Sequence, residues 1–499
     1  MKKVVIIGSG FAGISAASFM AKAGWDVTVL EKHTMAGGRA RMFSEDGFTF
    51  DMGPSWYWMP DVFERYFNCF GKNVSDYYQL ERLDPSYRVY WQNGPMDIPA
   101  DYKALMQLFE SLEKGAAEKL DAFMKEATYK YEVGMNKLVH KPGRSLTEFI
   151  DIDLAKGVLK LDVFTSMKKH ISKYFKHPQL RFLMEFPVLF LGALPEDTPA
   201  LYSLMNYADI KLGTWFPKGG MYAIVEGMHK LATEMGVKFH FNQNVVSIDI
   251  VDGKAKTVTA KSVLEDQSEF ISVFEADVVI GGADYHFIEQ ELLPLNCRSY
   301  NKEYWNTRIM APSCLLYYVG INKKLKNILH HSLFFDVDFD LHGTEIYSDP
   351  QWPTEPLFYV SATSVTDENL APENCENLFF LIPVATGLVG DTEELRDNYF
   401  EKIIKRFEEL TGEQIFDSII YKKSYSVSDF ITDYNAFKGN AYGLANTLMQ
   451  TAILKPSIKS KKVSNLFYTG QLTVPGPGVP PALISGEVVA KEIVKEFKP

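Results

Sequence analysis

The chain begins, after Met1, with Lys2-Lys3-Val4-Val5-Ile6-Ile7-Gly8-Ser9-Gly10-Phe11-Ala12-Gly13. The apolar run predicts a buried strand, and the G-x-G-x-x-G pattern at its end predicts a tight turn into a helix. Gly8 permits the turn, Gly10 lets the backbone approach a pyrophosphate, and Gly13 lets the helix pack close to the strand. The phosphates would lie at the positive N-terminus of that helix. This stretch therefore predicts a dinucleotide-binding site.

A second strand is predicted for residues 26–30, and it stops at Glu31. A carboxylate at this distance from the glycines is typical of a group that accepts hydrogen bonds from ribose hydroxyls. The next residues, Glu31-Lys32-His33-Thr34-Met35-Ala36-Gly37-Gly38-Arg39-Ala40, resemble an extension found in the FAD-dependent amine oxidase and carotenoid desaturase superfamily. There a Gly-Gly-Arg turn lies against the pyrophosphate, because glycines allow close backbone approach and Arg39 can neutralise phosphate charge. The resemblance makes FAD the expected cofactor.

The end of the chain predicts the second half of the same site. Residues 466–471 form a strand-like run, residues 472–481 a Gly/Pro-rich loop, and residues from about 482 to 497 a helix. The N-terminus of this helix would direct N–H groups and partial positive charge toward the loop. A flavin that has accepted a hydride carries negative charge at N1 and the C2 carbonyl, which a helix N-terminus stabilises.

Four further blocks extend the resemblance along the whole chain. They are Phe50-Asp51-Met52-Gly53-Pro54-Ser55, Phe216-Pro217-Lys218-Gly219-Gly220-Met221, Tyr434-Asn435-Ala436-Phe437-Lys438-Gly439-Asn440-Ala441-Tyr442-Gly443-Leu444 and Thr473-x-Pro475-Gly476-x-Gly478-Val479-Pro480. Together with the N-terminal fingerprint they look like the phytoene-desaturase type of FAD-dependent carotenoid desaturase. Gln471 stands where amine oxidases usually have Asp, which favours the desaturases. Val474 stands where many relatives have His, so this chain has no imidazole at that position.

The resemblance implies which residues contact FAD. The backbone of Val245 would meet the adenine, although an ordinary hairpin is the alternative for that stretch. The expected FAD contacts are Gly8, Ser9, Gly10, Ala12, Gly13, Glu31, Lys32, Gly38, Arg39, Gly53, Pro54, Ser55, Val245, Gly470, Gln471, Gly478, Val479 and Pro480.

The implied fold is α/β, with a Rossmann-like FAD-binding domain and an interleaved α+β substrate domain. We expect residues 1–95, 212–300 and 416–499 to form a discontinuous FAD-binding domain. The helical residues 96–211 and the mixed sheet and helix residues 301–415 would form the substrate and membrane-associating domain.

Local patterns support this division. Apolar repeats predict helices within residues 102–123 and 161–191. Residues 313–319 are strand-like, and a helix is predicted over residues 392–410.

Composition restricts the function further. The net charge of −11 provides no basic footprint for nucleic acid. The four cysteines, Cys69, Cys297, Cys314 and Cys375, have neither metal-ligand nor redox-pair spacing and suit a reducing cytosol. The histidines are spread singly apart from His330-His331, which indicates no metal site. Apolar stretches fall short of a membrane span and no signal peptide precedes the first strand, so we expect a cytoplasmic protein.

Aromatic residues make up 14% of the chain, and several gather in residues 56–70 after the Gly-Pro-Ser turn. Most such residues belong to a core, but their position favours an apolar tunnel for a long polyisoprenoid. Such a substrate is dissolved in the bilayer. We therefore expect peripheral attachment to the cytoplasmic membrane, through a helix around residues 61–70 or within 163–191, with inward packing as the alternative for each.

The predicted reaction is desaturation, in which oxidised flavin accepts a hydride. No motif singles out a base, so no catalytic side chain is predicted. Because only one dinucleotide fingerprint is present, a quinone or oxygen is the expected electron acceptor. Phytoene-type desaturation of a C40 carotenoid is preferred. The alternatives are late 3,4-desaturation of a hydroxylated or monocyclic carotenoid, carotenoid isomerisation, and non-enzymatic prenyl-lipid escort.

Overall fold

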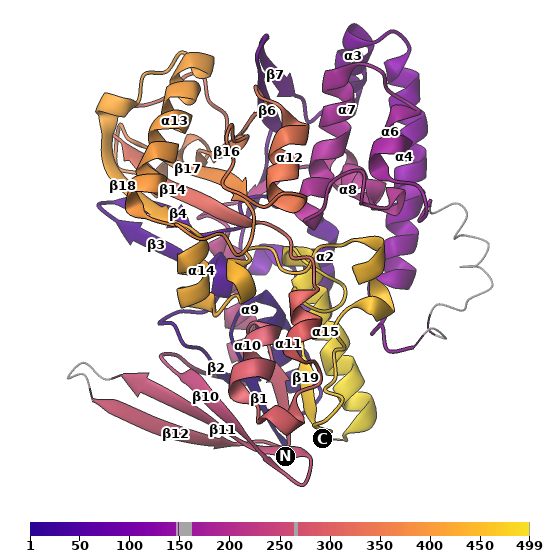
Figure 1. Ribbon diagram of the computed structural model, residues 1–499, viewed down its shortest axis with the longest axis vertical. Coiled ribbons are helices and arrows are strands. Elements are labelled where there is room, and N and C mark those ends of the chain that lie inside the picture. The colour runs from indigo at the N-terminus through magenta and orange to yellow at the C-terminus, as the bar shows by residue number, and fades with distance from the viewer. Residues whose placement is uncertain (146–147, 149–161, 264–267, 499) are drawn as a thin grey trace.

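The computed structural model describes residues 1–145, 148, 162–263 and 268–498. A parallel sheet of order β19-β13-β1-β2-β9 lies in the lower half of the molecule (Figure 1). Its strands are β1 (Lys3–Ile7), β2 (Asp26–Leu30), β9 (Lys238–His240), β13 (Val278–Gly281) and β19 (Leu466–Tyr468). Because three distant parts of the chain supply these strands, the predicted Rossmann-like fold is confirmed as a discontinuous one.

Three helices pack beside this sheet. α1 (Phe11–Lys22) contacts both α9 (Tyr222–Glu234) and α15 (Val479–Glu496). A Cβ added to Gly486 would lie only 2.4 Å from the carbonyl oxygen of Ala12, so glycine is needed for α15 to approach α1 this closely. The contact fixes the N-terminus of α15 near the glycine fingerprint. Both chain ends lie at the bottom of the molecule (Figure 1).

The helix predicted around residues 61–70 is α2 (Pro60–Asn68). Its apolar side chains Val62, Phe63, Tyr66 and Phe67 are all buried in the main hydrophobic core. On its partly exposed side, Arg65 forms a two-bonded ion pair with Glu487 of α15, at 2.6 and 2.7 Å. α2 therefore packs inward, and this helix provides no apolar face for a membrane.

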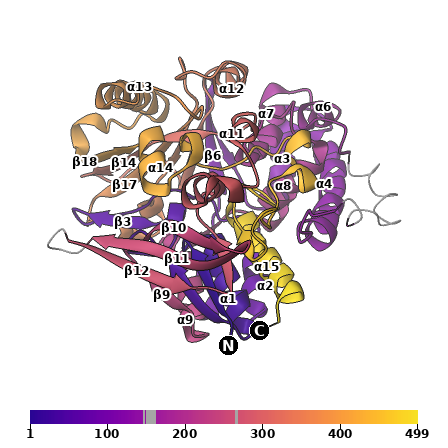
Figure 2. The same ribbon diagram turned by 60° about the horizontal axis from the view of Figure 1, so that its bottom comes forward.

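A three-stranded antiparallel sheet projects from one side of the parallel sheet (Figures 1 and 2). It contains β10 (Asn244–Val251), β11 (Lys254–Val263) and β12 (Glu269–Glu275). Val245, at the start of β10, is buried in the core that lies under this sheet and β13.

A seven-stranded sheet of order β18-β14-β17-β16-β15-β6-β7 forms much of the upper half. All its neighbours are antiparallel except β15 and β6. The strands are β6 (Tyr87–Trp91), β7 (Gly94–Ile98), β14 (Ser313–Ile321), β15 (His331–Phe334), β16 (Phe358–Ser361), β17 (Glu376–Val384) and β18 (Ile419–Tyr425). Helices α12 (Phe339–Tyr347) and α13 (Glu393–Thr411) belong to the same half, and α13 confirms the helix expected at residues 392–410.

The strands of this sheet differ from the expected domain boundaries at two places. β6 lies inside residues 1–95 and β18 inside residues 416–499, yet both hydrogen-bond into the upper sheet. The reason is pairing between distant segments: β6 pairs with β15 and β18 with β14, which no local pattern reveals.

The helical part stands beside the upper sheet, in purple at the upper right of Figure 1. It contains α3 (Tyr102–Leu112), α4 (Ala116–Val133), α6 (Met167–Ser172), α7 (Pro178–Glu185) and α8 (Leu204–Tyr207). These confirm the helices expected within residues 102–123 and in the described part of 161–191. The remaining strands and α-helices with assigned bounds are β3 (Met42–Glu45), β4 (Phe48–Asp51), β5 (Leu80–Arg82), β8 (Trp215–Pro217), α10 (Tyr285–Phe287), α11 (Lys302–Asn306) and α14 (Val427–Tyr434).

A buried carboxyl between the helical part and β6 makes stability depend on pH. Asp209 is 4% exposed and accepts a hydrogen bond from Tyr87 Oη at 3.0 Å, and burial raises its pKa to about 7. Because the folded pKa lies above the unfolded value of 3.8, its contribution is most favourable below pH 4 and is lost as the pH rises toward 7.

We expect Asp209→Asn to be as stable as the wild type at pH 4 and more stable at pH 8, by up to about 4 kcal/mol. Asparagine keeps the acceptor for Tyr87 but carries no charge. Urea unfolding at both pH values measures the difference. If the difference in unfolding free energy between the two proteins is the same at pH 4 and pH 8, the assignment is contradicted.

Candidate active site

One cavity of about 460 Å³ opens at the carboxyl ends of the parallel strands and continues toward the upper sheet. Ligands of open α/β sheets bind at this edge. Every residue that the sequence predicted to contact FAD lines this cavity, except Ser9 and Gly13. The exceptions have other tasks: Ser9 holds Glu31, and Gly13 meets the backbone of Gly8.

Each of the three fingerprint positions is occupied by glycine for a different physical reason. Gly8 has a φ of +95°, a conformation that favours glycine. A Cβ on Gly13 would lie 2.1 Å from the carbonyl oxygen of Gly8, so this position sets the approach of α1 to β1. A Cβ on Gly10 meets nothing within 4 Å. The space in front of Gly10 belongs to the cavity and fits a pyrophosphate group.

The carboxylate of Glu31 lies at the end of β2 and is 5% exposed. Its Oε2 accepts hydrogen bonds from Ser9 N at 2.9 Å and Ser9 Oγ at 2.8 Å, and its Oε1 accepts one from His33 N at 3.0 Å. An ionised carboxylate has about four acceptor positions, so room is left for a ribose hydroxyl. Glu31 therefore both braces the phosphate loop and faces the cavity.

We expect Glu31→Ala to weaken FAD binding by roughly 10-fold and to destabilise the protein by about 2 kcal/mol, since buried donors lose their acceptor. The matched control is Glu31→Gln, which keeps one acceptor oxygen, enough for Ser9 N and Oγ but not for His33 N as well, and it should have the smaller effect on unfolding. FAD titration and thermal unfolding measure the two effects. Equal losses for both variants would show that the hydrogen bonds are unimportant.

Two cations contribute to the phosphate side of the cavity. Arg39 lies over the face of Tyr434 at 5.2 Å and donates to the carbonyl oxygen of Asn440 at 3.0 Å. Its Nε has no hydrogen-bond partner within the described part of the chain, and burial lowers its pKa, opposed by Asp284. Lys32 donates to the carbonyl oxygen of Thr432 at 2.8 Å. A half-buried guanidinium with an unused donor suits the charge of a pyrophosphate.

The helix predicted from about residue 482 begins three residues earlier, at Val479. Gly478 precedes it with a φ of +106°, and Pro480 and Pro481 occupy the next two positions. Proline has no N–H, so Val479 supplies the only donor among the first three helical residues. The helix dipole still points at the cavity, but fewer N–H groups face it than the sequence suggested.

The strand before this helix is held by buried hydroxyls. Ser485 Oγ accepts a hydrogen bond from Gly470 N at 3.0 Å and lies 3.0 Å from Thr469 Oγ1. The side-chain amide of the neighbouring Gln471 contacts Asn440 Oδ1 at 2.9 Å, and in the orientation that satisfies both of its ends it accepts from Arg39 Nη2 at 3.1 Å and donates to the carbonyl oxygen of Tyr442 at 3.2 Å. These bonds position Gly470 and Gln471 at the cavity wall.

The upper arm of the cavity is apolar, and sequence reasoning missed most of it. From the predicted aromatic cluster, Trp56 and Trp58 line the arm, whereas Tyr57, Phe63, Tyr66 and Phe67 are buried in the core. The other lining side chains of the arm include Phe186, Leu189, Leu194, Met205, Pro312, Cys314, Leu316, Leu333, Phe335, Phe339, His342, Ile346, Tyr347, Leu357, Phe358, Tyr359, Leu381, Pro383 and Tyr442. They come from β14, β15, β16 and β17 or the residues that flank them, from α12, from the helical part and, for Tyr442, from the segment after α14, so no single stretch of sequence indicates the arm.

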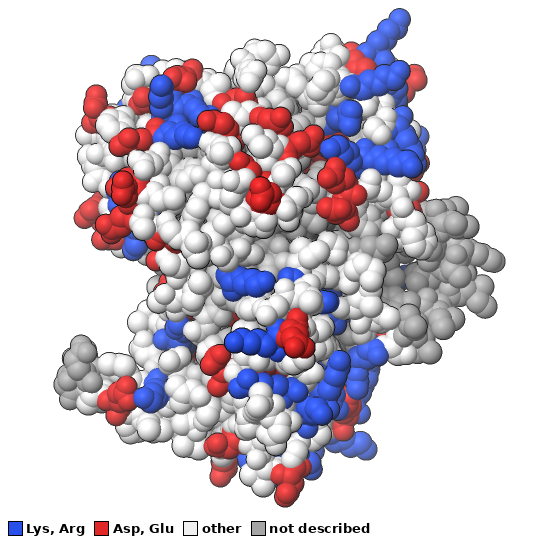
Figure 3. Space-filling model, viewed as in Figure 1, with Lys and Arg blue, Asp and Glu red and all other residues white. Residues whose placement is uncertain are grey.

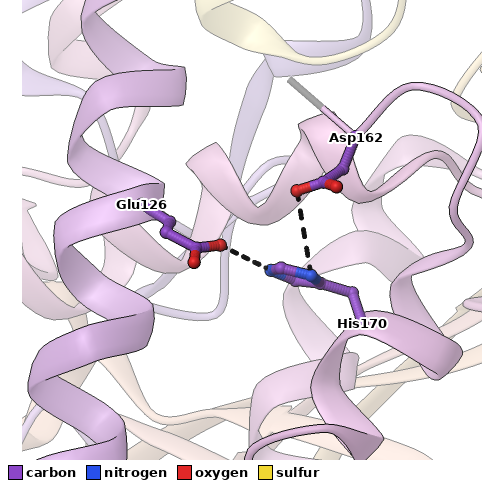
Figure 4. A group of neighbouring side chains, drawn as sticks. All are labelled: Glu126, Asp162 and His170. Atoms are coloured by element: carbon purple, nitrogen blue, oxygen red, sulfur yellow. Dashed lines mark ion pairs between the residues drawn. The ribbon is translucent and has the colours of Figure 1, made fainter. Parts of the chain in front are cut away.

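One cluster outside the cavity resembles a metal site. Glu126, Asp162 and His170 face one another in the helical part (Figure 4), with His170 Nε2 3.5 Å from Glu126. Lys130 Nζ, however, lies 3.0 Å from Asp162 and supplies the positive charge. We interpret the cluster as an ion-pair network.

Comparisons with known proteins agree with this geometry. A family model described as flavin containing amine oxidoreductase matches residues 11–494. The chain is 40% identical over 496 residues to a carotenoid 3,4-desaturase from Haloarcula japonica, covering 99% of this chain and 98% of that protein. It is 30% identical to a zeta-carotene-forming phytoene desaturase from Myxococcus xanthus, covering 99% and 94%.

Among solved structures, an oxidoreductase from Methanosarcina mazei superposes with a TM-score of 0.61 at 16% identity, covering 98% of this chain and all of that one. This likeness shows a shared fold. The chain thus belongs to the flavin-containing amine oxidoreductase family, and it is an FAD-dependent carotenoid desaturase, an oxidoreductase that acts on CH–CH bonds.

Proposed function

We propose that this desaturase carries out phytoene-type desaturation of a linear carotenoid held in the apolar arm. The supporting observation is that a single cavity is lined both by the N-terminal glycines, where we expect the phosphates, and by a wall of apolar side chains. When bound, FAD supplies a hydride acceptor. The chain's own task is to hold one C–C bond of the substrate at the junction of the two parts and to exclude water there.

Late 3,4-desaturation is the second candidate. A relative named carotenoid 3,4-desaturase is 40% identical to this chain, whereas the relative named phytoene desaturase is 30% identical. Two tyrosines of the arm, Tyr347 and Tyr442, could hydrogen-bond a terminal hydroxyl. We retain the phytoene type as the main proposal because the apolar lining of the arm tolerates a chain that shifts its register between successive steps.

Expression in cells that accumulate only phytoene tests this choice. Conversion of phytoene to more conjugated products supports the main proposal. Unchanged phytoene, together with conversion of a hydroxylated and already conjugated carotenoid, would replace it with the late reaction. A matched strain that expresses Gly10→Val provides the control for flavin-dependent conversion.

Anaerobic mixing of the oxidised holoprotein with substrate separates desaturation from isomerisation and from prenyl-lipid escort. A desaturase bleaches the flavin absorbance in proportion to product formed, because each double bond transfers two electrons. An isomerase converts its substrate without net bleaching, and an escort protein produces neither change. We propose that the electron acceptor is a quinone or oxygen. Reoxidation of the bleached protein with each of them in turn identifies which one it is.

We also propose peripheral attachment to the cytoplasmic membrane, on the side of the helical part. Phe164 is 83% exposed and Met449 is 71% exposed. The two segments are neighbours, since Thr165 accepts a hydrogen bond from Ala200 N at 2.7 Å and Tyr202 contacts Thr451. Lys and Arg side chains gather over the helical part at the upper right of Figure 3, where they suit anionic headgroups. In the described residues, no helix is both long and apolar enough to cross a bilayer.

Liposome flotation tests this attachment. The wild type should float with anionic vesicles, and Phe164→Asp with Met449→Asp should float less while keeping its bound FAD. Failure of the wild type to float, with full activity on substrate delivered without lipid or detergent, would rule the attachment out.

A further inference from the structure

His331 is a buried histidine on the cavity side of β15. It lies in β15 two residues before Leu333, which lines the cavity, and side chains two apart in a strand share a face. Its ring stacks on Trp56, with centroids 4.1 Å apart and an angle of 9° between the planes. The residue is fully buried. Within the described part of the chain, none of the expected FAD contacts forms a hydrogen bond with this imidazole.

A hydrogen bond connects His331 to a residue of the cavity wall. Its Nδ1 lies 2.6 Å from Tyr359 Oη, and Tyr359 lines the arm. Tyr359 is on β16, directly opposite Leu333 in the register of the sheet. His331 Nε2 has no hydrogen-bond partner among the described residues. A proton on this ring can therefore be exchanged with the cavity through the Tyr359 hydroxyl.

We propose that Tyr359 is a catalytic residue of the desaturation and that His331 is its proton acceptor; this inference rests on the proposed function. Bound FAD would supply the acceptor for a hydride from one substrate carbon. The C–H bond of the adjacent carbon then breaks, and its electron pair forms the new C=C bond. The released proton passes to Tyr359 Oη while the proton of that hydroxyl moves to His331 Nδ1. The substrate thus loses a hydride and a proton, and the protein later returns the proton to solvent.

The environment of the pair suits this task. Burial holds the pKa of His331 well below its ordinary value, so the imidazole is neutral and free to accept a proton at physiological pH. It is then a weak base. A weak base suffices because the C–H bond next to a delocalised allylic cation is strongly acidic. The imidazolium that forms lies on the face of Trp56, where a cation is stabilised.

Isotope effects on single turnovers test the proposal. Tyr359→Phe should lower the single-turnover rate of product formation by about 100-fold, and in steady-state assays KM should change little. In this variant the isotope effect should grow for deuterium at the carbon that loses the proton, and shrink at the carbon that loses the hydride. A purely structural defect would slow both steps and leave that ratio unchanged.

The matched control is Tyr317→Phe, which removes a buried tyrosine hydroxyl from β14. That hydroxyl donates to the carbonyl oxygen of Arg396 at 2.5 Å and belongs to a different core, so the control should keep the wild-type ratio. His331→Asn retains an acceptor for Tyr359 but no basic nitrogen, and it should reproduce the Tyr359→Phe effect. Flavin absorbance confirms that each variant is folded.

Nitrogen-15 NMR of histidine-labelled, flavin-free protein provides a readout that does not depend on activity. We expect His331 to carry its proton on Nε2 and to accept at Nδ1, with the Nδ1 signal shifting in Tyr359→Phe. A proton found on Nδ1 would overturn the proposal, because the acceptor position is then filled. Wild-type turnover with an unchanged isotope ratio in Tyr359→Phe would also overturn it, and would leave the desaturase function itself standing.

Discussion

Replacement of Gly10 by valine is expected to abolish FAD binding while leaving the protein folded. Gly10 has a φ of −71°, which valine adopts without strain, and a Cβ at this position meets no atom within 4 Å. The added side chain would instead occupy the space in front of the N-terminus of α1, where we expect the pyrophosphate to bind. We expect FAD affinity to fall at least roughly 100-fold, equivalent to about 2.7 kcal/mol.

Gly13→Ala provides the contrast. Its Cβ would lie 2.1 Å from the carbonyl oxygen of Gly8, so this smaller substitution should lower the melting temperature of the flavin-free protein. Flavin absorbance after dialysis measures binding, and calorimetry measures folding. A Gly10→Val protein that keeps stoichiometric FAD would show that the pyrophosphate lies elsewhere.

The N-terminal part of the candidate FAD site was predictable because its determinants are local. The strand, the glycines, the helix and Glu31 follow one another within about thirty residues, and each residue type has one physical reason to be there. Two details were beyond local reasoning. The internal hydrogen bonds of Glu31 and the prolines inside the first turn of α15 depend on where helices begin and on what packs against them.

The substrate half was not predictable for the opposite reason. The side chains of its wall are alternate residues of strands. The strands that pair with them lie far away in the sequence, as in the pairing of β15 with β6. Leu316, Leu333 and Leu381 resemble any buried strand residue, and only the sheet brings them to one cavity. The pair of histidines at residues 330 and 331 was visible in the sequence, but nothing there indicated that His331 would contact Tyr359.

Filling the apolar arm is expected to stop carotenoid conversion without loss of FAD. Cys314, on β14, is 2% exposed and lines the arm, and burial raises its pKa to about 12, so the thiol stays neutral. In Cys314→Trp the indole would project into the cavity from a central strand, where an aromatic residue is well tolerated. A substrate displaced by even about 1 Å from its reactive position loses roughly 100-fold in rate, so turnover should fall by at least that factor.

The control, Cys314→Ala, removes the same thiol but leaves the arm open, and it should keep most of the activity. Both variants should retain the flavin absorbance of the wild type, because Cys314 lies outside the predicted FAD contacts. Anaerobic bleaching by substrate distinguishes them. Bleaching of Cys314→Trp at the wild-type rate would mean that the carotenoid reaches the flavin by another path. Loss of bleaching in both variants would instead indicate that the thiol itself is required. Loss in Cys314→Trp alone ties the substrate to the arm, since the two variants differ only in the volume that they leave empty.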